Sequence, residues 1–417
     1  MTDRSFGGFV ARAAAAGELV VQPRMGVAGP ARMRAGLAAV RGAGVRAAGT
    51  ITVDSFTRVG EHLAVRRALD TGAELNGYPI VAHSPGTTRA VLDGLRGRDF
   101  PVQVRHGSAC PQKIVAALLA AGLDATEGGP LSYCLPYSRV PVAESVRAWA
   151  ESCLLLSDAR ERGARPHLES FGGCMMGQLC PPSLLVAISV LEGLFFRQHG
   201  VDSMSLSYAQ QTDPGQDAEA VAALRALAAE HLSDVDWHVV LYTYMGVFPR
   251  TPHGATALLE RSAELAVRTG AERLIVKTTA EAHRIPTVAE NVTALVTAAA
   301  AAAQAEPGGP IEDTGVLDEA RALVEAVLGL APDVGIALVR AVERGYLDVP
   351  YCLHQDNAGR TRAFVDGDGR LQWSRIGALP LPAGRAVPAA APTADELLRS
   401  LTHVERAFDR PSPRPQE

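Results

Sequence analysis

Residues 203–242, SMSLSYAQQTDPGQDAEAVAALRALAAEHLSDVDWHVVLY, join two short strand-like runs through one helical pattern. Ser203–Ser207 alternates polar and apolar residues, and Trp237–Tyr242 is mostly apolar. Between them, Asp217–His231 repeats its apolar residues with the spacing of a helix. Two strands that are joined by a helix lie parallel in one sheet, because the crossover returns the chain to the starting edge. The segment therefore predicts a parallel α/β architecture.

The same alternation continues in both directions. The other candidate strands are Glu18–Gln22, Gly49–Val53, Pro79–His83, Val102–Arg105, Ala125–Glu127, His167–Glu169 and Arg273–Lys277. The other helical patterns are Ala31–Arg41, Glu61–Thr71, Gln112–Ala121, Val142–Ser157, Leu184–His199 and Gly254–Thr269. One long series without a GxGxxG fingerprint favours a closed (β/α)8 TIM-type barrel over an open dinucleotide-binding sheet. We assign the barrel to residues 1–290. Nine candidates compete for eight strand places, and the runs at 79–83 and 125–127 give the weakest signals.

The pattern changes in the last part of the chain, which we assign to a C-terminal extension over residues 291–417. A helical stretch from Val288 to Ala305 meets the break EPGGP at 306–310, and further helical segments follow near 313–329 and 333–344. Two short runs around Asp366-Gly-Asp-Gly369 predict a small hairpin. From Pro380 the chain is rich in proline and alanine, with one helical run at 393–408 and a polar tail.

Bulk composition excludes several classes of protein. The net charge of −5 is too small for general attraction to nucleic acid or anionic lipid. No apolar run reaches the length of about 20 residues that a membrane span needs, and no secretory signal is recognisable, so we expect a cytoplasmic protein. The six cysteines are too sparse for a disulfide scaffold and contain no Cys-x-x-Cys pair, which predicts reduced thiols and no metal site.

Polar side chains gather at the expected carboxyl ends of the strands, which meet at one mouth in a parallel barrel. The residues at these positions are Arg24, Arg58, Arg105, His106, Glu127, Glu169, Tyr208, Tyr244 and Lys277. Three arginines from three strands suit a small dianion, because guanidinium groups hold carboxylates in a bidentate way. The spacing alone is also compatible with three separate ion pairs at the rim or with a phosphate site.

Two further features stand out at this mouth. Glu127 opens the segment EGGPLSYCLPY, whose glycines let the backbone approach a ligand closely. Near an arginine cluster, Glu127 could receive a substrate ammonium group or simply pair with an arginine. Of the 40 basic residues only Lys113 and Lys277 are lysines, and Lys277 ends a candidate strand, which marks it as a candidate functional residue.

The chain resembles the large (epsilon) subunit of glutamate mutase, also called methylaspartate mutase, from about residue 18 to about 380. The resemblance is carried by VVQPRMG, TITVDSFTR, LNGYP, VQVRHG, ATEGGPLSYCLPY, LCPPS, MGVFP and LIVKTTAEAHRIPT, in the order of the family. It implies a (β/α)8 barrel that interconverts L-glutamate and (2S,3S)-3-methylaspartate by an adenosylcobalamin radical mechanism. Tyr242-Thr-Tyr-Met-Gly246 departs from the His-Gln-Trp-Met-Gly of the family, so that wall of the site differs.

The resemblance also implies roles for individual residues. Arg24, Arg58 and Arg105, with His106 beside them, would hold the two substrate carboxylates, and Glu127 would contact the amino group as a catalytic base. Tyr133 and Tyr137 would also contact substrate. The positions implied for adenosylcobalamin binding are Gly26, Asn76, Pro136, Phe248, Lys277, Glu281 and Ile285.

Asp-x-His-x-x-Gly, the cobalamin-binding motif of the partner family, is missing from this sequence. Its nearest match is His83-Ser-Pro-Gly86, which has Val81 in place of the aspartate and falls inside the expected barrel. We therefore expect a separate small cobalamin-binding subunit as partner, and the resemblance implies a homodimer of large subunits. Two alternatives stay open: a mutase for another dicarboxylic amino acid, and a non-catalytic or regulatory barrel partner of a corrinoid protein.

Overall fold

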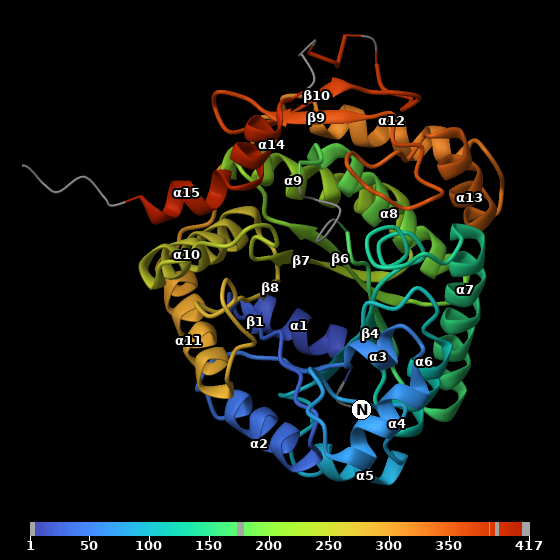
Figure 1. Ribbon diagram of the computed structural model, residues 1–417, viewed down its shortest axis with the longest axis vertical. Helices are drawn as coiled ribbons and strands as arrows, with labels where there is room; N and C mark the ends of the chain where they lie inside the picture. Colours follow the sequence, from blue (N-terminus) through green and yellow to red (C-terminus); the bar gives the residue numbers. More distant parts are fainter. Residues whose placement is uncertain (1–4, 173–178, 383, 388–391, 411–417) are drawn as a thin grey trace, which may run out of the picture.

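The computed structural model describes residues 5–172, 179–382, 384–387 and 392–410. Eight parallel strands form the centre, and the described helices surround them (Figure 1). The strands are β1 (Val20–Gln22), β2 (Gly49–Thr52), β3 (Val102–Arg105), β4 (Ala125–Glu127), β5 (His167–Glu169), β6 (Ser203–Ala209), β7 (Asp236–Tyr242) and β8 (Arg273–Ile275). Each strand pairs with the next from β2 to β8, and β1 pairs with β8. Val21 also bridges Ala47, just before β2, which closes the ring. The prediction of a (β/α)8 barrel is confirmed.

The structure decides which of the nine strand candidates is wrong. Ala125–Glu127 is β4 and pairs with both β3 and β5. The run at 79–83 is not a strand: Tyr78 makes one bridge to Val53, and the chain then turns, with the Ala82 amide donating to the Pro79 carbonyl. Pro79 has no amide hydrogen for a ladder, so a strand cannot continue through it on that edge.

The outer ring consists mainly of one helix after each strand. These helices are α2 (Pro30–Arg41), α6 (Gln112–Ala120), α7 (Val142–Ala159, continued by a 3₁₀ turn at Arg160–Arg162), α8 (Pro182–Gln198), α9 (Pro214–His231), α10 (Pro252–Thr269) and α11 (Val288–Gln304). Three shorter helices fill the β2–β3 connection: α3 (Ser55–Arg58), α4 (His62–Thr71) and α5 (Pro85–Leu92). Because α11 packs against α10, α2 and β1, it takes the eighth helical place, and the expected barrel boundary at residue 290 falls inside it.

A helix without a counterpart in the sequence-based prediction closes the amino-terminal end of the barrel. It is α1 (Phe6–Ala15), which contacts β1, β6 and β7 (Figure 1). Its Phe6 ring stacks on His167 at 5.0 Å between centroids, and the Arg273 guanidinium lies 4.9 Å from the Phe6 centroid. The buried set Phe6, Phe9, Val10 and Ala13 has helical spacing that could have predicted it.

The C-terminal extension packs on one side of the barrel. It contains α12 (Val316–Leu328), α13 (Val334–Arg344), the antiparallel hairpin of β9 (Arg362–Val365) and β10 (Leu371–Arg375), α14 (Ala394–Leu401) and α15 (His403–Asp409). Helix α12 covers α8 and α9, and α13 covers α7 and α8. Asp409 accepts hydrogen bonds from the amides of Arg250 and Thr251, at 2.8 and 3.0 Å, and so anchors α15 beside the start of α10.

The structure bears on two predictions from the composition, which concern the cysteines and membrane-spanning helices. The cysteines at positions 110, 134, 153, 180 and 352 are free thiols, and Cys174 lies outside the described residues. Across the described ranges, no helix is long and apolar enough to cross a membrane.

Candidate active site

Four polar side chains from four strands meet inside the barrel, near the carboxyl ends of β3, β4, β5 and β7. The Arg105 guanidinium contacts the Glu127 carboxylate at 2.7 Å and the Glu169 carboxylate at 3.6 Å. Arg105 Nη1 also donates to the Tyr242 hydroxyl at 3.1 Å. The Tyr242 hydroxyl is 3.0 Å from Glu127 Oε2 and donates to Glu169 as well. All four side chains are buried, which strengthens their electrostatic coupling. We call these four residues the lumen cluster.

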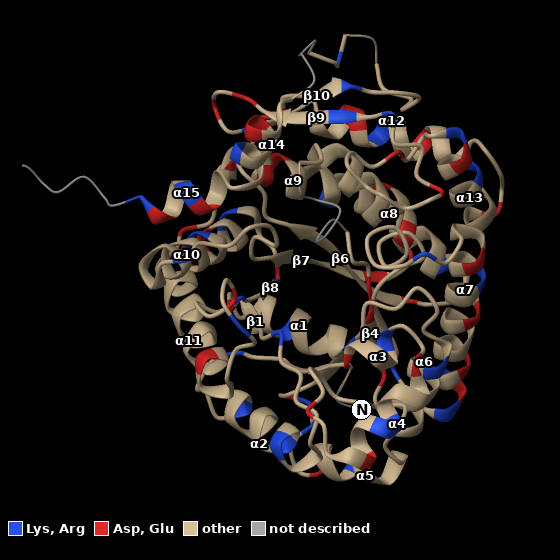
Figure 2. Ribbon diagram, viewed as in Figure 1, with Lys and Arg blue, Asp and Glu red and all other residues tan. Residues whose placement is uncertain are grey.

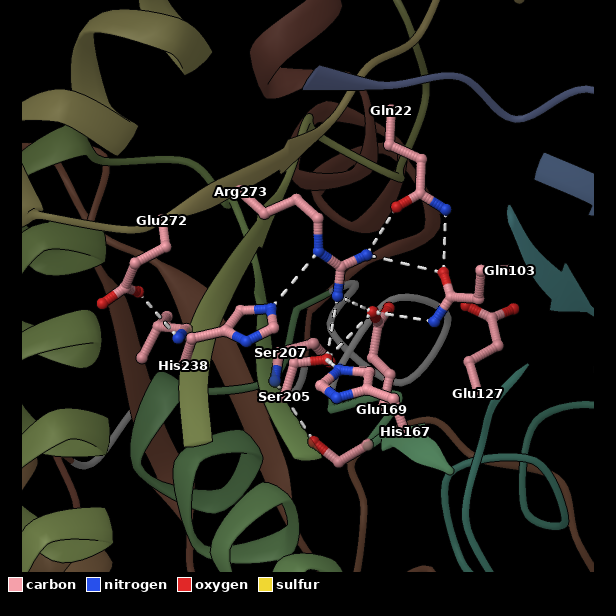
Figure 3. A network of polar contacts seen from close by, with 12 residues as sticks. Gln22, Gln103, Glu127, His167, Glu169, Ser205, Ser207, His238, Glu272 and Arg273 are labelled. Atoms are coloured by element: carbon pink, nitrogen blue, oxygen red, sulfur yellow. Dashed lines mark hydrogen bonds and ion pairs between the residues drawn. The ribbon is translucent and has the colours of Figure 1, made fainter. Parts of the chain in front are cut away.

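A polar network directly below holds Glu169 in place (Figure 3). The fully buried Arg273 donates to Glu169 Oε2, to Ser205 Oγ at 2.8 Å and to Gln22 Oε1 at 2.6 Å. Gln103 donates to the same Glu169 oxygen at 3.2 Å. A buried ion pair is favourable only when further hydrogen bonds satisfy the charged groups, and this one is surrounded by such partners. Figure 2 shows charged positions inside the ring of helices as well as on its outer surface.

The two carboxylates of the lumen cluster differ in protonation. Burial and the charge of Glu169 raise the pKa of Glu127 to about 7, although Arg105 opposes this shift. Burial acts in the same way on Glu169, but Arg273 and Arg105 overcome it and hold its pKa below the ordinary value. Surroundings that give two carboxyl groups different pKa values allow them to take different chemical roles. Glu169 stays ionised, whereas Glu127 can bind or release a proton near neutral pH.

His106 offers a neutral hydrogen-bond donor beside this pair. The Ser108 amide donates to His106 Nδ1 at 3.0 Å, which assigns the ring proton to Nε2. Burial and the neighbouring Arg105 lower the pKa of His106 to about 3, so the ring is uncharged. The ring stacks on Trp149, and Nε2 is buried without a partner among the described residues. A buried donor of this kind carries a desolvation cost unless a ligand accepts its hydrogen bond.

Arg58, Tyr133 and Tyr137 extend the site toward the rim. Tyr133 donates its hydroxyl to Glu127 Oε1, and its ring lies 5.8 Å from that of Tyr137. The Arg58 guanidinium lies 5.7 Å from the Tyr137 ring centroid, and Arg58 Nε is buried without a hydrogen-bond partner in the described part of the chain. At Gly107, two residues after Arg105, an added Cβ would lie 3.0 Å from Arg58 Cδ. The turn after β3 thus sets the position of Arg58.

A second polar group lies at the ends of β1 and β8. The carboxylate of Glu281 is 3.7 Å from Arg24 Nη1 and 3.9 Å from Lys277 Nζ, and the Lys277 ammonium lies 4.3 Å above the Phe248 ring. The loop that carries Arg24 is pressed against β2, because a Cβ on Gly26 would lie 2.5 Å from the Thr52 carbonyl oxygen. We call Arg24, Phe248, Lys277 and Glu281 the β1–β8 group.

Three other residues implied by the resemblance lie away from these groups, at the rim. Asn76 is exposed and accepts a hydrogen bond from the Ser55 amide at 2.9 Å, and 65% of the Ile285 side chain is exposed. Pro136 lines a cavity of about 1080 Å³ that Arg58 and Tyr137 also border. The structure thus brings Arg105, His106, Glu127 and Tyr133 into direct contact, and Arg24 pairs with Glu281 on the β1–β8 side.

Sequence reasoning assigned no role to Glu169, Tyr242 or Arg273, and it placed one residue wrongly. Tyr208 does not face the mouth: its hydroxyl donates to Asp217 of α9 at 2.8 Å. On β6, Ser205 and every second residue from it point into the barrel, so Tyr208 points to the helices. Arg273 carried a usable signal, because a charged residue opens an otherwise apolar strand.

The sequence is similar to one protein family over nearly its whole length. Residues 2–389 match the family model described as methylaspartate mutase E chain. The glutamate mutase epsilon subunit of Halobacterium salinarum is 35% identical over 348 residues, which cover 79% of this chain and 71% of the relative. The protein of the same name from Escherichia coli O157:H7 is 31% identical over 350 residues, covering 79% and 72%.

Proposed function

The chain belongs to the methylaspartate mutase E chain family, and we propose that it is the substrate-binding catalytic subunit of an isomerase that interconverts L-glutamate and (2S,3S)-3-methylaspartate. The proposal includes an adenosylcobalamin radical mechanism. Besides the family relationship, one structural observation supports the proposal. Arg105 and Glu127 form a buried ion pair at the carboxyl ends of neighbouring strands, with their side chains 2.7 Å apart. This arrangement suits an amino acid, because Arg105 can bind a ligand carboxylate while Glu127 binds the ligand ammonium group.

The charges of the site explain why such a ligand fits. Without ligand, Arg105 and Glu127 neutralise each other inside the barrel. A ligand carboxylate that takes Arg105 leaves Glu127 unpaired, and the ligand ammonium then pairs with Glu127. The exchange leaves no buried charge alone, which would cost several kcal/mol. Arg58 and Arg24 would hold the second carboxylate, with Tyr133, Tyr137 and the Nε2–H of His106 orienting the substrate. Fixing both acid ends keeps the reacting carbons in one geometry.

The β1–β8 group suits the adenosyl part of adenosylcobalamin. Lys277 and Glu281 present a cation and a carboxylate at the mouth, and the Glu281 ion pairs of 3.7 and 3.9 Å leave its oxygens available to ribose hydroxyls. Gly26, Asn76, Pro136, Phe248 and Ile285 would contact the rest of the cofactor. When bound, adenosylcobalamin supplies the radical by cleavage of its carbon–cobalt bond. The residues of the barrel then bind, orient and shield the substrate.

Exposed apolar side chains around the mouth support the docking of a small cobalamin-binding subunit. Phe56 and Val59 follow β2, Ile285 follows β8, and Leu353 lines the cavity beside Tyr137. Leu353 is 98% exposed and Ile285 is 65% exposed. We call these four residues the apolar rim. Apolar side chains gathered on one face typically mark a contact surface.

Replacing Leu353 and Ile285 together with aspartate should weaken binding of the small subunit at least about tenfold, because two charges would be desolvated in the interface. Glutamate binding to the chain alone should not change. Ile336 on α13 is also exposed, at 49%, but lies on the outer helices, so Ile336→Asp serves as the control. Equal affinity of the double variant and the control, measured by calorimetry, would refute the assigned surface.

The glycine after His106 allows a sharp test of the Arg58 position. In Gly107→Ala the new methyl group would push against Arg58 Cδ, and the positive φ of 69° adds backbone strain of about 1 kcal/mol. Gly122→Ala carries the same kind of strain, at φ 81°, with no atom within 4 Å. Both variants should lose similar stability, but only Gly107→Ala should bind glutamate less tightly, by about three- to tenfold. Identical affinities would show that Arg58 does not hold the ligand.

The function as a whole is tested by reconstitution. The purified chain, a small subunit with the Asp-x-His-x-x-Gly motif and adenosylcobalamin should together convert glutamate to 3-methylaspartate, and omission of any one should abolish the conversion. A panel of other dicarboxylic amino acids tests the alternative substrate that the departure at Tyr242–Tyr244 from the family pattern suggests. Tight uptake of adenosylcobalamin by the chain alone, with histidine bound to cobalt, would contradict the proposed division of labour.

A further inference from the structure

One tyrosine joins both carboxylates of the lumen cluster. The Tyr242 hydroxyl accepts from Arg105 Nη1 at 3.1 Å, lies 3.0 Å from Glu127 Oε2 and also contacts Glu169 Oε1. The side chain is fully buried, so water does not compete for these contacts. A phenol carries a single proton and can donate it to only one carboxylate at a time. The two carboxylates therefore compete for one donor.

The groups around each carboxylate decide this competition. Glu127 faces Arg105 from β3, Tyr133 from the loop after β4, Glu169 from β5 and Tyr242 from β7. Glu169 faces Arg105 and Tyr242 too, but it also receives Arg273 from β8, Ser205 from β6 and Gln103 from β3. His167, at the other end of β5, is uncharged because burial lowers its pKa to about 3. Glu169 thus stays ionised without Tyr242, whereas Glu127 has only Arg105 and Tyr133 besides Tyr242 to favour its ionised form.

We propose that Tyr242 is a positioning residue whose hydroxyl donates its single hydrogen bond in turn to Glu127 and to Glu169, and to Glu169 alone when a ligand ammonium group binds Glu127. In the free protein this hydrogen bond helps to keep Glu127 ionised and ready for an ammonium group. In the complex the ammonium replaces it, and the hydroxyl stabilises the Glu169 carboxylate alone. The part that concerns the ligand rests on the proposed function, whereas the part that concerns the free protein does not.

The free protein is tested by infrared or ¹³C NMR titration of the Glu127 carboxyl group, assigned by its loss in Glu127→Gln. Because a donor to a carboxylate favours the ionised form, Tyr242→Phe should raise the titration midpoint by about one pH unit. Tyr208→Phe is the matched control: Tyr208 is equally buried and donates to the buried Asp217 at 2.8 Å, outside the lumen. It should leave the Glu127 midpoint unchanged. An unchanged midpoint in Tyr242→Phe would overturn the proposal.

A second variant covers the event that Tyr242→Phe does not fold. Incorporation of 3-fluorotyrosine at position 242 keeps the size of the ring and strengthens the phenol as a donor. The Glu127 midpoint should then move in the opposite direction, downward, and a midpoint that stays or rises would refute the hydrogen bond from Tyr242 to Glu127.

Glutamate affinity separates this inference from the proposed function. Tyr242→Phe should bind glutamate about fivefold more weakly than the parent chain at pH 7 and equally well at pH 9, where Glu127 is ionised in both. Equal ratios of the two affinities at the two pH values would refute the assigned hydrogen bond from Tyr242 to Glu127. If the parent chain bound no glutamate at any pH, the proposed function and the ligand-dependent part would fail together, and the titration would still decide the role of Tyr242 in the free protein.

Discussion

Glu127→Gln should lower the turnover number of the reconstituted enzyme about 100- to 1000-fold, the range expected for a lost acid–base group. The amide has nearly the same shape, so it can still contact Tyr133 and Tyr242. It cannot carry the negative charge that pairs with a substrate ammonium, and it cannot exchange a proton. Stability should also fall, because Arg105 then shares the Glu169 carboxylate, 3.6 Å away, with Arg273, so turnover is compared per folded enzyme.

The pH dependence gives the same prediction a second readout. Since burial raises the pKa of Glu127 to about 7, its ionised form gains population as the pH rises through that value. Activity of the parent enzyme should therefore rise between about pH 6 and 8, and this limb should be absent in Glu127→Gln. Asp217→Asn is the control, because burial raises the pKa of Asp217 to about 8 and it accepts from Tyr208, yet it lies outside the lumen. A Glu127→Gln enzyme with ordinary turnover would remove Glu127 from the mechanism.

Arg105→Lys should lower kcat/KM for glutamate about 100-fold, with a higher KM and a slower turnover. The Arg105 guanidinium reaches Glu127, Glu169 and Tyr242 at once, through nitrogens that point in fixed directions. A lysine ammonium is a single charge centre that cannot repeat this arrangement or grip a carboxylate in a bidentate way. In the folded protein, Glu127 would also lose part of its counter-charge, so its protonated form should persist to higher pH.

The control for this variant is Arg225→Lys. Arg225 also forms a close ion pair, with Glu272 at 2.7 Å, but it is partly exposed and lies on α9. Kinetic constants for Arg225→Lys should stay within about twofold of the parent values, as expected for an exposed pair. If Arg105→Lys behaved like this control, Arg105 would have no part in holding a substrate carboxylate.

The fold could be predicted from the sequence where local pattern decides the structure. Alternation of strand and helix signals is a local property, and it predicts all eight strands and the main helices near their observed bounds. The strand predicted at 79–83 is wrong. The run is mostly apolar, as in a strand, but it begins with Pro79, which has no amide hydrogen to continue a ladder. Helix α1 gives a weaker signal, because only four apolar residues, Phe6, Phe9, Val10 and Ala13, carry its helical spacing before the first strand.

The candidate site could be predicted only in part. Arg105, Glu127 and Tyr133 follow strand ends within recognisable phrases, and the structure brings them together. Tyr242 reaches Glu127 across the barrel, over 115 positions of sequence, and Tyr208 turns away although it too lies in a strand. Which face of a strand looks inward depends on register around the closed ring, and a shift of one residue reverses it. The sequence alone does not contain that register.

A crystal structure of the chain with (2S,3S)-3-methylaspartate would show whether Arg105 and Glu127 separate to bind the two ends of an amino acid. We expect one ligand in the lumen, with its ammonium group on Glu127, one carboxylate on Arg105 and the other on Arg58 and Arg24. Arg24 should then turn from Glu281, its ligand-free partner at 3.7 Å, toward the ligand. A ligand bound elsewhere, or a lumen in which Arg105 and Glu127 keep their 2.7 Å contact with the ligand present, would contradict the account.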